Sequence, residues 1–162
     1  MIIRKVELRD AEEITAIYNH YIENTIITFE EEPITIDEMA SRIETISSQY
    51  PYLVYEENGK VVGYAYATQW KTRSAYRYSA ENTIYLHPDA KGKGIGSVLF
   101  QKFLMEIKNT NLHVLVGGIA LPNAASVALH EKFGFKKIGQ FEEIGFKFGK
   151  WIDVGYWELK LK

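Results

Sequence analysis

The sequence predicts a mixed α/β fold with seven strands and four helices, in the order β-α-α-β-β-β-α-β-α-β-β. Short runs rich in β-branched and aromatic residues alternate with segments whose apolar residues recur every three or four positions. The pair Asn58-Gly59 is a strong hairpin signal between strands at residues 52–55 and 61–67. Residues 81–107 have the pattern of a strand, a glycine turn and a helix. These three observations favour one mixed α/β domain.

The N-terminal part is expected to contain a strand and two helices. Residues 2–8 form the strand, and Asp10, with Glu13 three positions later, has the pattern of an N-cap and capping box. After a polar and aromatic loop, Thr35 or Asp37 begins the second helix. The predicted buried positions of the two helices are Ile14, Ile17, Tyr18, Tyr21, Ile22, Met39, Ile43 and Ile46.

The C-terminal part is expected to contain three strands and a helix. Residues 112–116 form a short strand that ends at a Gly-Gly pair. A helix follows Asn123, and Gly134 stands where a left-handed C-cap is expected. The two last strands are predicted near residues 141–148 and 154–161.

The segment 81–107 has the features of an anion site. Its strand stops at Pro88, and the alternate glycines Gly92, Gly94 and Gly96 precede a helix. Unpaired backbone N–H groups and the positive end of the helix dipole then point at one place. Glycine allows close approach of an anion, because it has no Cβ. We therefore predict a phosphate-binding turn; the alternative is a glycine-rich connection that only caps a helix.

Two common phosphate motifs do not fit this turn, although Lys91 and Lys93 add positive charge beside it. A P-loop needs Ser or Thr after Gly-Lys, and here Gly94 follows Lys93. A dinucleotide fingerprint needs a third glycine where Leu99 stands, and an acidic residue after the next strand.

Composition indicates a globular protein of one domain, residues 1–162, without a membrane or nucleic-acid role. The chain is 46% hydrophobic, has a net charge of −2 and contains no cysteine. No apolar run approaches the roughly 20 residues that span a bilayer. The absence of cysteine excludes disulfides and a cysteine nucleophile, and the four histidines lack metal-ligand spacing. We expect a cytoplasmic protein with no metal.

Several segments match a known family in addition to the glycine turn, whose motif KGKGIG begins at Lys91: residues 17–22 (IYNHYI), 81–86 (ENTIYL), 121–123 (LPN) and 145–155 (GFKFGKWIDVG). With these segments the chain resembles the GNAT N-acetyltransferases, and more closely the phosphinothricin acetyltransferase-like subfamily. Lysine stands at residue 91, where this family usually has Gln or Arg. The resemblance implies a twisted mixed sheet of about seven strands flanked by about four helices, acetyl-CoA as co-substrate, and a homodimer.

The resemblance also implies which residues bind acetyl-CoA. Backbone groups of one strand bind the pantetheine arm and the acetyl carbonyl, the glycine turn binds the pyrophosphate, and an asparagine that opens the next helix binds the arm. In this sequence the implied residues are Tyr85, Leu86, His87, Lys91, Lys93, Gly94, Ile95, Gly96, Ser97, Val98 and Asn123.

An acetyl transfer to an amine needs a base, because amines of the lysine type have a pKa of about 10.4. By the resemblance Glu81 is this base; without it, a surface glutamate is the simpler interpretation. The Leu86 N–H is the candidate donor to the oxyanion. His130, seven residues after Asn123, is implied either as the acid for the leaving thiolate or as a hydrogen-bonding residue.

The acceptor is expected to be small and amino-acid-like, such as phosphinothricin or methionine sulfone. Arg73 can hold its carboxylate, with pocket walls from Phe29, Trp70, Tyr76 and Tyr78. These aromatic residues could equally form a subunit interface. Two alternatives stay open: a protein N-terminal or lysine acetyltransferase, and an inactive acetyl-CoA sensor.

Overall fold

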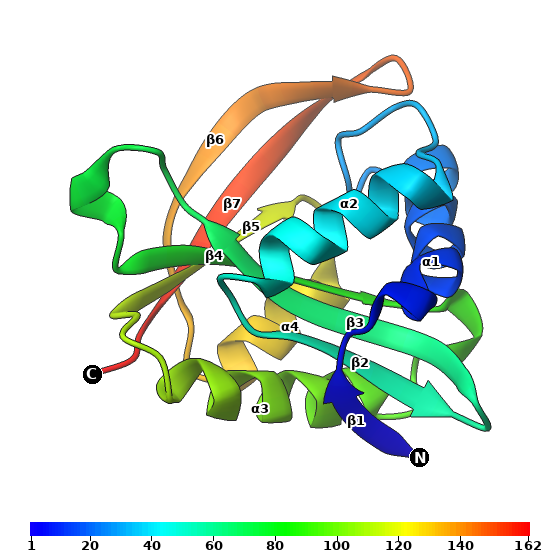
Figure 1. The fold of residues 1–162 in the computed structure, drawn as a ribbon. Helices are drawn as coiled ribbons and strands as arrows, with labels where there is room; N and C mark the ends of the chain where they lie inside the picture. Colours follow the sequence, from blue (N-terminus) through cyan, green and yellow to red (C-terminus); the bar gives the residue numbers. More distant parts are fainter. The chain divides into compact units, whose positions relative to one another are not determined.

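The computed structural model describes residues 1–162 and contains the seven strands and four helices in the predicted order (Figure 1). Hydrogen bonds join the strands into one sheet of order β1-β2-β3-β4-β5-β7-β6. The strands are β1 (Ile2–Lys5), β2 (Tyr52–Glu57), β3 (Lys60–Gln69), β4 (Ser79–Leu86), β5 (Val114–Ala120), β6 (Lys136–Lys147) and β7 (Lys150–Lys160). The helices are α1 (Ala11–Asn24), α2 (Ile36–Ser47), α3 (Ile95–Lys108) and α4 (Ala124–Lys132).

The chain forms two compact units, which we describe separately. The first unit contains residues 1–19, 34–68 and 82–111, and the second contains residues 20–33, 69–81 and 112–162. Strand β4 contributes its first three residues to the second unit and the rest to the first. The single domain predicted from the sequence stays a prediction.

In the first unit, α2 and α3 lie on opposite sides of β2 and β3 (Figure 1). On the sheet face that α3 covers, β3 has room only for a glycine at residue 63. A Cβ on Gly63 would lie 2.6 Å from Cδ2 of Leu86 and 3.4 Å from Cδ2 of Leu99. On the other side, Tyr64 packs against Tyr85, with ring centroids 5.6 Å apart. Gly63 therefore lets the end of β4 pack closely under α3.

The hairpin predicted at Asn58-Gly59 is confirmed, with φ values of 53° and 76° at the two residues and antiparallel pairing of β2 with β3. Thr35 is the N-cap of α2, and its side chain accepts a hydrogen bond from the Glu38 N–H at 3.1 Å. Seven of the eight predicted positions in α1 and α2 are buried; the exception, Ile46, is half-buried.

The first strand and its cap differ from the sequence prediction. β1 ends at Lys5, and a short 3-10 turn ends at Asp10. Asp10 does not pair with Glu13: its carboxylate accepts two 2.8 Å bonds from Arg4 and one from the Glu7 N–H. Glu13 accepts instead from the Val61 N–H at 2.8 Å. The buried carboxylate of Asp10 is used to neutralise Arg4, a partner that the local pattern does not reveal.

In the second unit, the prediction that β5 ends at the Gly-Gly pair is wrong. The strand continues to Ala120, and Gly117 and Gly118 pair with Trp157 and Tyr156 of β7. Pairing with β7 holds the glycines in an extended conformation that their own propensity does not favour. On its other side β5 pairs with β4 in parallel at three positions, of which Glu81 with Val116 is the last.

Strands β6 and β7 form a long hairpin, which begins earlier on both strands than the sequence predicts. Its turn has positive φ values at Phe148 (51°) and Gly149 (70°). The register shifts between Phe141 and Gly145, where Glu143 also has a positive φ. Gly134 has a φ of 90° after α4, which confirms the predicted C-cap.

Candidate active site

The glycine turn of the first unit has an open backbone in a left-handed conformation that suits an anion. Gly92 and Gly94 have φ values of 75° and 78°, and a Cβ on either residue would meet no atom within 4 Å. Gly94 is the N-cap of α3, so the first N–H groups of a 14-residue helix begin here. Lys91 and Lys93 are exposed beside the turn. The turn therefore has the backbone donors, the helix dipole and the charge that a pyrophosphate requires.

The end of β4 leads into this turn. Leu86 packs beneath the turn, because a Cβ on Gly96 would lie 3.3 Å from its Cδ1. His87 uses both of its backbone groups inside the chain, since its N–H donates to Val62 at 2.8 Å and its carbonyl accepts from Ala90 at 2.9 Å. Its Nδ1 accepts from the Asp89 N–H. These contacts favour a turn-closing role for His87 over contact with a ligand.

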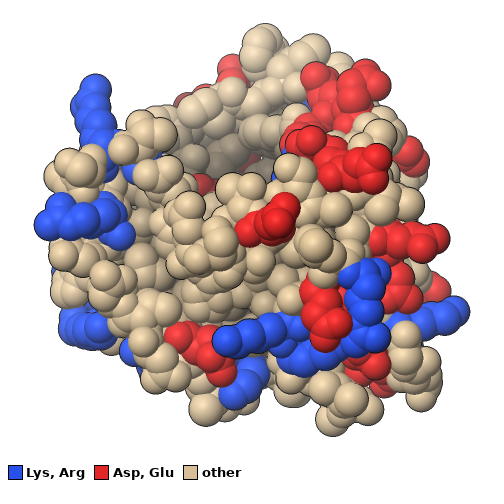
Figure 2. Space-filling view, in the orientation of Figure 1, with Lys and Arg blue, Asp and Glu red and all other residues tan.

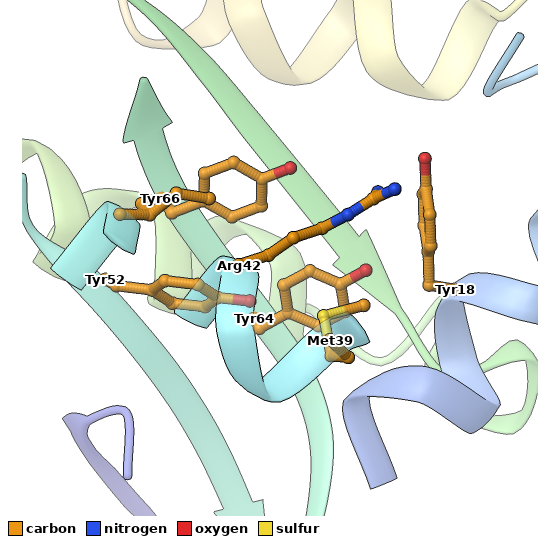
Figure 3. Close-up of a pocket in the computed structure, with 7 residues that line it drawn as sticks. Tyr18, Met39, Arg42, Tyr52, Tyr64 and Tyr66 are labelled. Carbon is orange, nitrogen blue, oxygen red and sulfur yellow. The ribbon is translucent and has the colours of Figure 1, made fainter. Parts of the chain in front are cut away.

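A cluster of tyrosines that sequence reasoning missed lies beside Tyr85 in the first unit. Tyr18 and Tyr64 place their rings 5.5 and 5.6 Å from that of Tyr85. Figure 3 shows the small pocket next to them, where the Arg42 guanidinium extends toward Tyr18. Burial raises the pKa of the Tyr64 phenol well above its ordinary value. The cluster therefore stays neutral and gives this face of β4 a rigid aromatic support. The full lining of the pocket is Tyr18, Met39, Arg42, Ile46, Tyr52, Tyr64 and Tyr66.

Glu81 lies in a sheltered place in the second unit. It is half-buried, and burial raises the pKa of its carboxyl above the ordinary 4.5, while the Lys71 ammonium partly offsets this effect. The neighbouring Tyr156 has a raised pKa because of its own burial and the charge of Glu81. A carboxylate whose pKa is raised toward neutrality is a better proton acceptor than an exposed one. The position suits a general base.

Asn123 and His130 lie at the two ends of α4. The Asn123 side chain caps the helix by accepting from the Ser126 N–H at 3.2 Å. His130 is 3% exposed, with its Nδ1 2.8 Å from the Ser126 carbonyl oxygen. A carbonyl only accepts, so Nδ1 must carry the proton and donate it.

This contact decides what His130 can do. Burial lowers the pKa of the imidazole, although the bond to Ser126 partly opposes the shift. At neutral pH the ring is therefore uncharged, and its one proton is held on Nδ1. This state favours a hydrogen-bonding role over donation of a proton to a leaving group.

The aromatic segment before β4 is divided between two environments. Trp70 is half-buried and packs edge-on against Tyr156, with centroids 5.8 Å apart. Tyr76 and Tyr78 are each 42% exposed, and Arg73 is exposed. Figure 2 shows the basic side chains of this segment at the left of the view. Trp70 therefore packs against Tyr156, which is itself a neighbour of Glu81. Arg73, Tyr76 and Tyr78 lie on the surface.

Phe29 lies in the loop between α1 and α2. Its ring covers Gly145 so closely that a Cβ there would overlap it. The preceding residue, Thr28, is held by the buried Lys147, whose ammonium donates to its carbonyl at 2.7 Å. Sequence reasoning did not single out Lys147 or Tyr156, and it placed Gly118 at the end of a strand rather than inside one.

No group of three or more His, Asp or Glu side chains lies close enough to hold a metal ion. None of the four helices is long and apolar enough to cross a membrane.

The seven-stranded mixed sheet and the glycine turn before α3 agree with the fold of an acetyltransferase. A family model described as an acetyltransferase (GNAT) domain matches residues 3–155. The chain therefore belongs to the GNAT acetyltransferase family.

Within the family, the chain is similar to proteins named as acetyltransferases of amino-acid-like compounds and to one named as an acetyltransferase of a ribosomal protein. The L-methionine sulfoximine/L-methionine sulfone acetyltransferase of Salmonella typhimurium is 37% identical over 99% of this chain and 95% of its own. A phosphinothricin acetyltransferase of Sinorhizobium meliloti, solved in complex with acetyl-CoA, has a TM-score of 0.94 at 37% identity, covering 98% and 87%. A ribosomal-protein-alanine N-acetyltransferase of Brucella melitensis has a TM-score of 0.96 at 34% identity, covering 99% of both chains.

Proposed function

We propose that this protein transfers the acetyl group of acetyl-CoA to the α-amine of a small amino-acid-like acceptor, with Glu81 as the base. The observation that carries the proposal is the sheltered carboxylate of Glu81, on the strand that runs into the glycine turn. The relatives named for methionine sulfone and phosphinothricin support an acceptor that bears a carboxylate. Arg73 has the planar guanidinium that such a group prefers.

The glycine turn fits the cofactor, because its left-handed glycines leave the N-terminus of α3 uncovered. The turn and Lys93 bind the pyrophosphate, and the Asn123 amide binds the pantetheine arm. Acetyl-CoA supplies a thioester whose carbonyl carbon bonds to the amine nitrogen as its C–S bond breaks. Glu81 would take the proton that the amine loses, directly or through water, and the Leu86 backbone would stabilise the acetyl oxygen. The thiolate leaves without a dedicated acid, since a thiol pKa is about 8.5.

A second candidate is a protein N-terminal or lysine acetyltransferase. It is favoured by the high similarity to the protein named for ribosomal alanine acetylation. The base and the cofactor site would be the same, and only the acceptor would differ. Exposed Tyr76 and Tyr78 would then contact a peptide.

The test is a thiol-release assay with acetyl-CoA against phosphinothricin, methionine sulfone, methionine sulfoximine, common amino acids and short peptides. Glu81→Gln should lower turnover about 10²–10⁴-fold, the usual contribution of a general base, with acetyl-CoA affinity retained by calorimetry. Glu158→Gln is the matched control, because Val116 pairs with Glu81 on one side and with Glu158 on the other. Turnover of peptides alone would contradict the amino-acid acceptor and support a protein acetyltransferase. Binding of acetyl-CoA without turnover of any acceptor would indicate a sensor.

We also propose that the protein acts as a cytoplasmic homodimer. The dimer is supported by apolar side chains on the edge hairpin, where Phe146 and Trp151 form an exposed ring pair 4.8 Å apart. A second copy is a natural cover for such an edge. Sedimentation equilibrium should give a dimer that Phe146→Glu converts to a monomer, and a monomeric wild type would contradict this. The exposed apolar residues of the hairpin are Ile138, Phe141, Ile144, Phe146, Phe148 and Trp151.

A further inference from the structure

Gly118 lies in the middle of a strand that has no backbone need for glycine. It is an interior residue of β5, paired with Tyr156 of β7, and it is not among the glycines with a positive φ. Glycine in a strand interior is destabilising relative to alanine. A glycine kept there points to close approach of another group.

Two side chains, those of Tyr156 and Glu81, lie close to the position that a Cβ on Gly118 would occupy. A Cβ on Gly118 would lie 3.1 Å from Cε1 of Tyr156 and 3.5 Å from Oε1 of Glu81. Gly118 is nevertheless exposed to solvent, although these two side chains stand close beside it. Bare backbone therefore forms the floor of a notch between a carboxylate and an aromatic ring.

Further aromatic rings support the tyrosine wall of this notch. Trp70 and Phe141 each pack edge-on against Tyr156 with centroids 5.8 Å away, at interplanar angles of 73° and 90°. A carboxylate attracts an ammonium group through its charge, and the adjacent aromatic ring offers apolar contact to a carbon skeleton. The Glu81 carboxylate stands close beside the Gly118 backbone, since its Oε1 is 3.5 Å from the position that a Cβ would occupy, so a group that contacts this backbone lies near the carboxylate.

We infer that Gly118 is the floor of the acceptor subsite: the acceptor amine lies over its backbone, next to Glu81, with its carbon skeleton against Tyr156. This inference rests on the proposed function and adds to it a residue that sets acceptor specificity. Any side chain at this position takes the volume that the amine and its α-carbon need. Acceptors whose amine is on an unbranched CH₂ should tolerate it better than those with a substituted α-carbon.

The test is Gly118→Ala, with Gly139→Ala as the matched control. Gly139 pairs with Tyr156 from the other side, and a Cβ there meets no atom within 4 Å. Gly118→Ala should lower kcat/KM for the best acceptor about 10–200-fold, the usual effect of one methylene in a binding site. The KM for acetyl-CoA should stay unchanged, and Gly139→Ala should match the wild type in both constants.

A simpler explanation is that Gly118 only accommodates the Tyr156 ring, and a double-mutant cycle separates the two explanations. In a Tyr156→Val background the ring is absent. If the acceptor needs the space, Gly118→Ala still lowers kcat/KM at least tenfold in that background. If only the Tyr156 ring needs the space, adding Gly118→Ala to the Tyr156→Val variant leaves kcat/KM unchanged, and the inference is overturned.

The failure of this inference differs from the failure of the proposed function. A wild type that acetylates an amino acid, loses turnover in Glu81→Gln and keeps full kcat/KM in Gly118→Ala refutes the subsite alone. A wild type that acetylates no amino acid refutes the proposed function. Circular dichroism and acetyl-CoA calorimetry on each variant establish that it is folded.

Discussion

Replacing the buried Lys147 tests whether the loop between α1 and α2 is anchored to β6. Lys147 is 2% exposed, and its ammonium donates a 2.7 Å hydrogen bond to the Thr28 carbonyl. Burial lowers the pKa of the ammonium, although the charge of Glu31 partly opposes the shift. This bond ties two segments that are 119 positions apart in the sequence.

The magnitude follows from the two effects of Lys147→Met. A hydrogen bond from a charged donor contributes about 1.5–3 kcal/mol. Methionine fills a similar volume and removes the cost of burying a charge, which offsets part of the loss. We expect a net decrease of about 1–2 kcal/mol in the free energy of unfolding. For a chain of this size that corresponds to a Tm lower by roughly 2–8 °C.

The assay is urea denaturation and thermal melting of Lys147→Met beside Lys150→Met. Lys150 is the control because it pairs with Lys147 across the hairpin and is exposed. Its replacement should change the free energy of unfolding by less than about 0.5 kcal/mol. Equal stability of the two variants would refute the anchoring role of Lys147.

The same substitution has a kinetic consequence if Phe29 contacts the acceptor. Phe29 follows Thr28 directly, so a released carbonyl loosens the ring that covers Gly145. The KM for the acceptor should rise severalfold in Lys147→Met, with the KM for acetyl-CoA unchanged. Gly145→Ala displaces the same ring without touching the anchor and should raise the acceptor KM alone, leaving stability nearly unchanged because the ring end can move into solvent.

Two further predictions use charges. Lys71→Gln removes the cation that lowers the pKa of Glu81, so the acid limb of the pH profile of kcat/KM should move to higher pH. Lys71→Arg keeps the charge and should leave this limb in place. An unmoved limb in the Gln variant would contradict the assignment of Glu81 as the base. Asp10→Asn removes one of the two carboxylates that Arg4 contacts at 2.8 Å, while Glu56 remains, and should cost about 1.5–3 kcal/mol in urea denaturation, the contribution of charged hydrogen bonds. Burial raises the pKa of Asp10, but Arg4 and a backbone bond lower it below 3.8, so the wild type alone should lose this stabilisation as pH falls below 3.8. Glu38→Gln, in an exposed pair, is the control.

The features that sequence predicted best are local ones. The Asn58-Gly59 hairpin and the Gly94 turn each depend on the conformational preferences of a few adjacent residues, and both have the expected positive φ values. A turn needs no distant partner to adopt its backbone conformation. The backbone conformation of the glycine turn could therefore be predicted from the sequence.

The features that sequence missed depend on partners far along the chain. Gly117 and Gly118 look like the end of a strand until β7, some 40 residues later, holds them in the sheet. The tautomer of His130 follows from its burial and its contact with the Ser126 carbonyl. Neither fact is available from residue types and spacing.

The cofactor turn and the acceptor notch differ in how far apart their residues lie in the sequence. The glycine turn, which we propose binds acetyl-CoA, is continuous in sequence, so overall similarity to the family is enough to predict it. The notch around Gly118 is assembled from β4, β5, β7 and the aromatic segment before β4. Relatives of nearly equal identity are named for different acceptors, so overall identity does not choose between them. The shape of that notch, which Gly118→Ala changes by one methyl group, is where acceptor choice has to be measured.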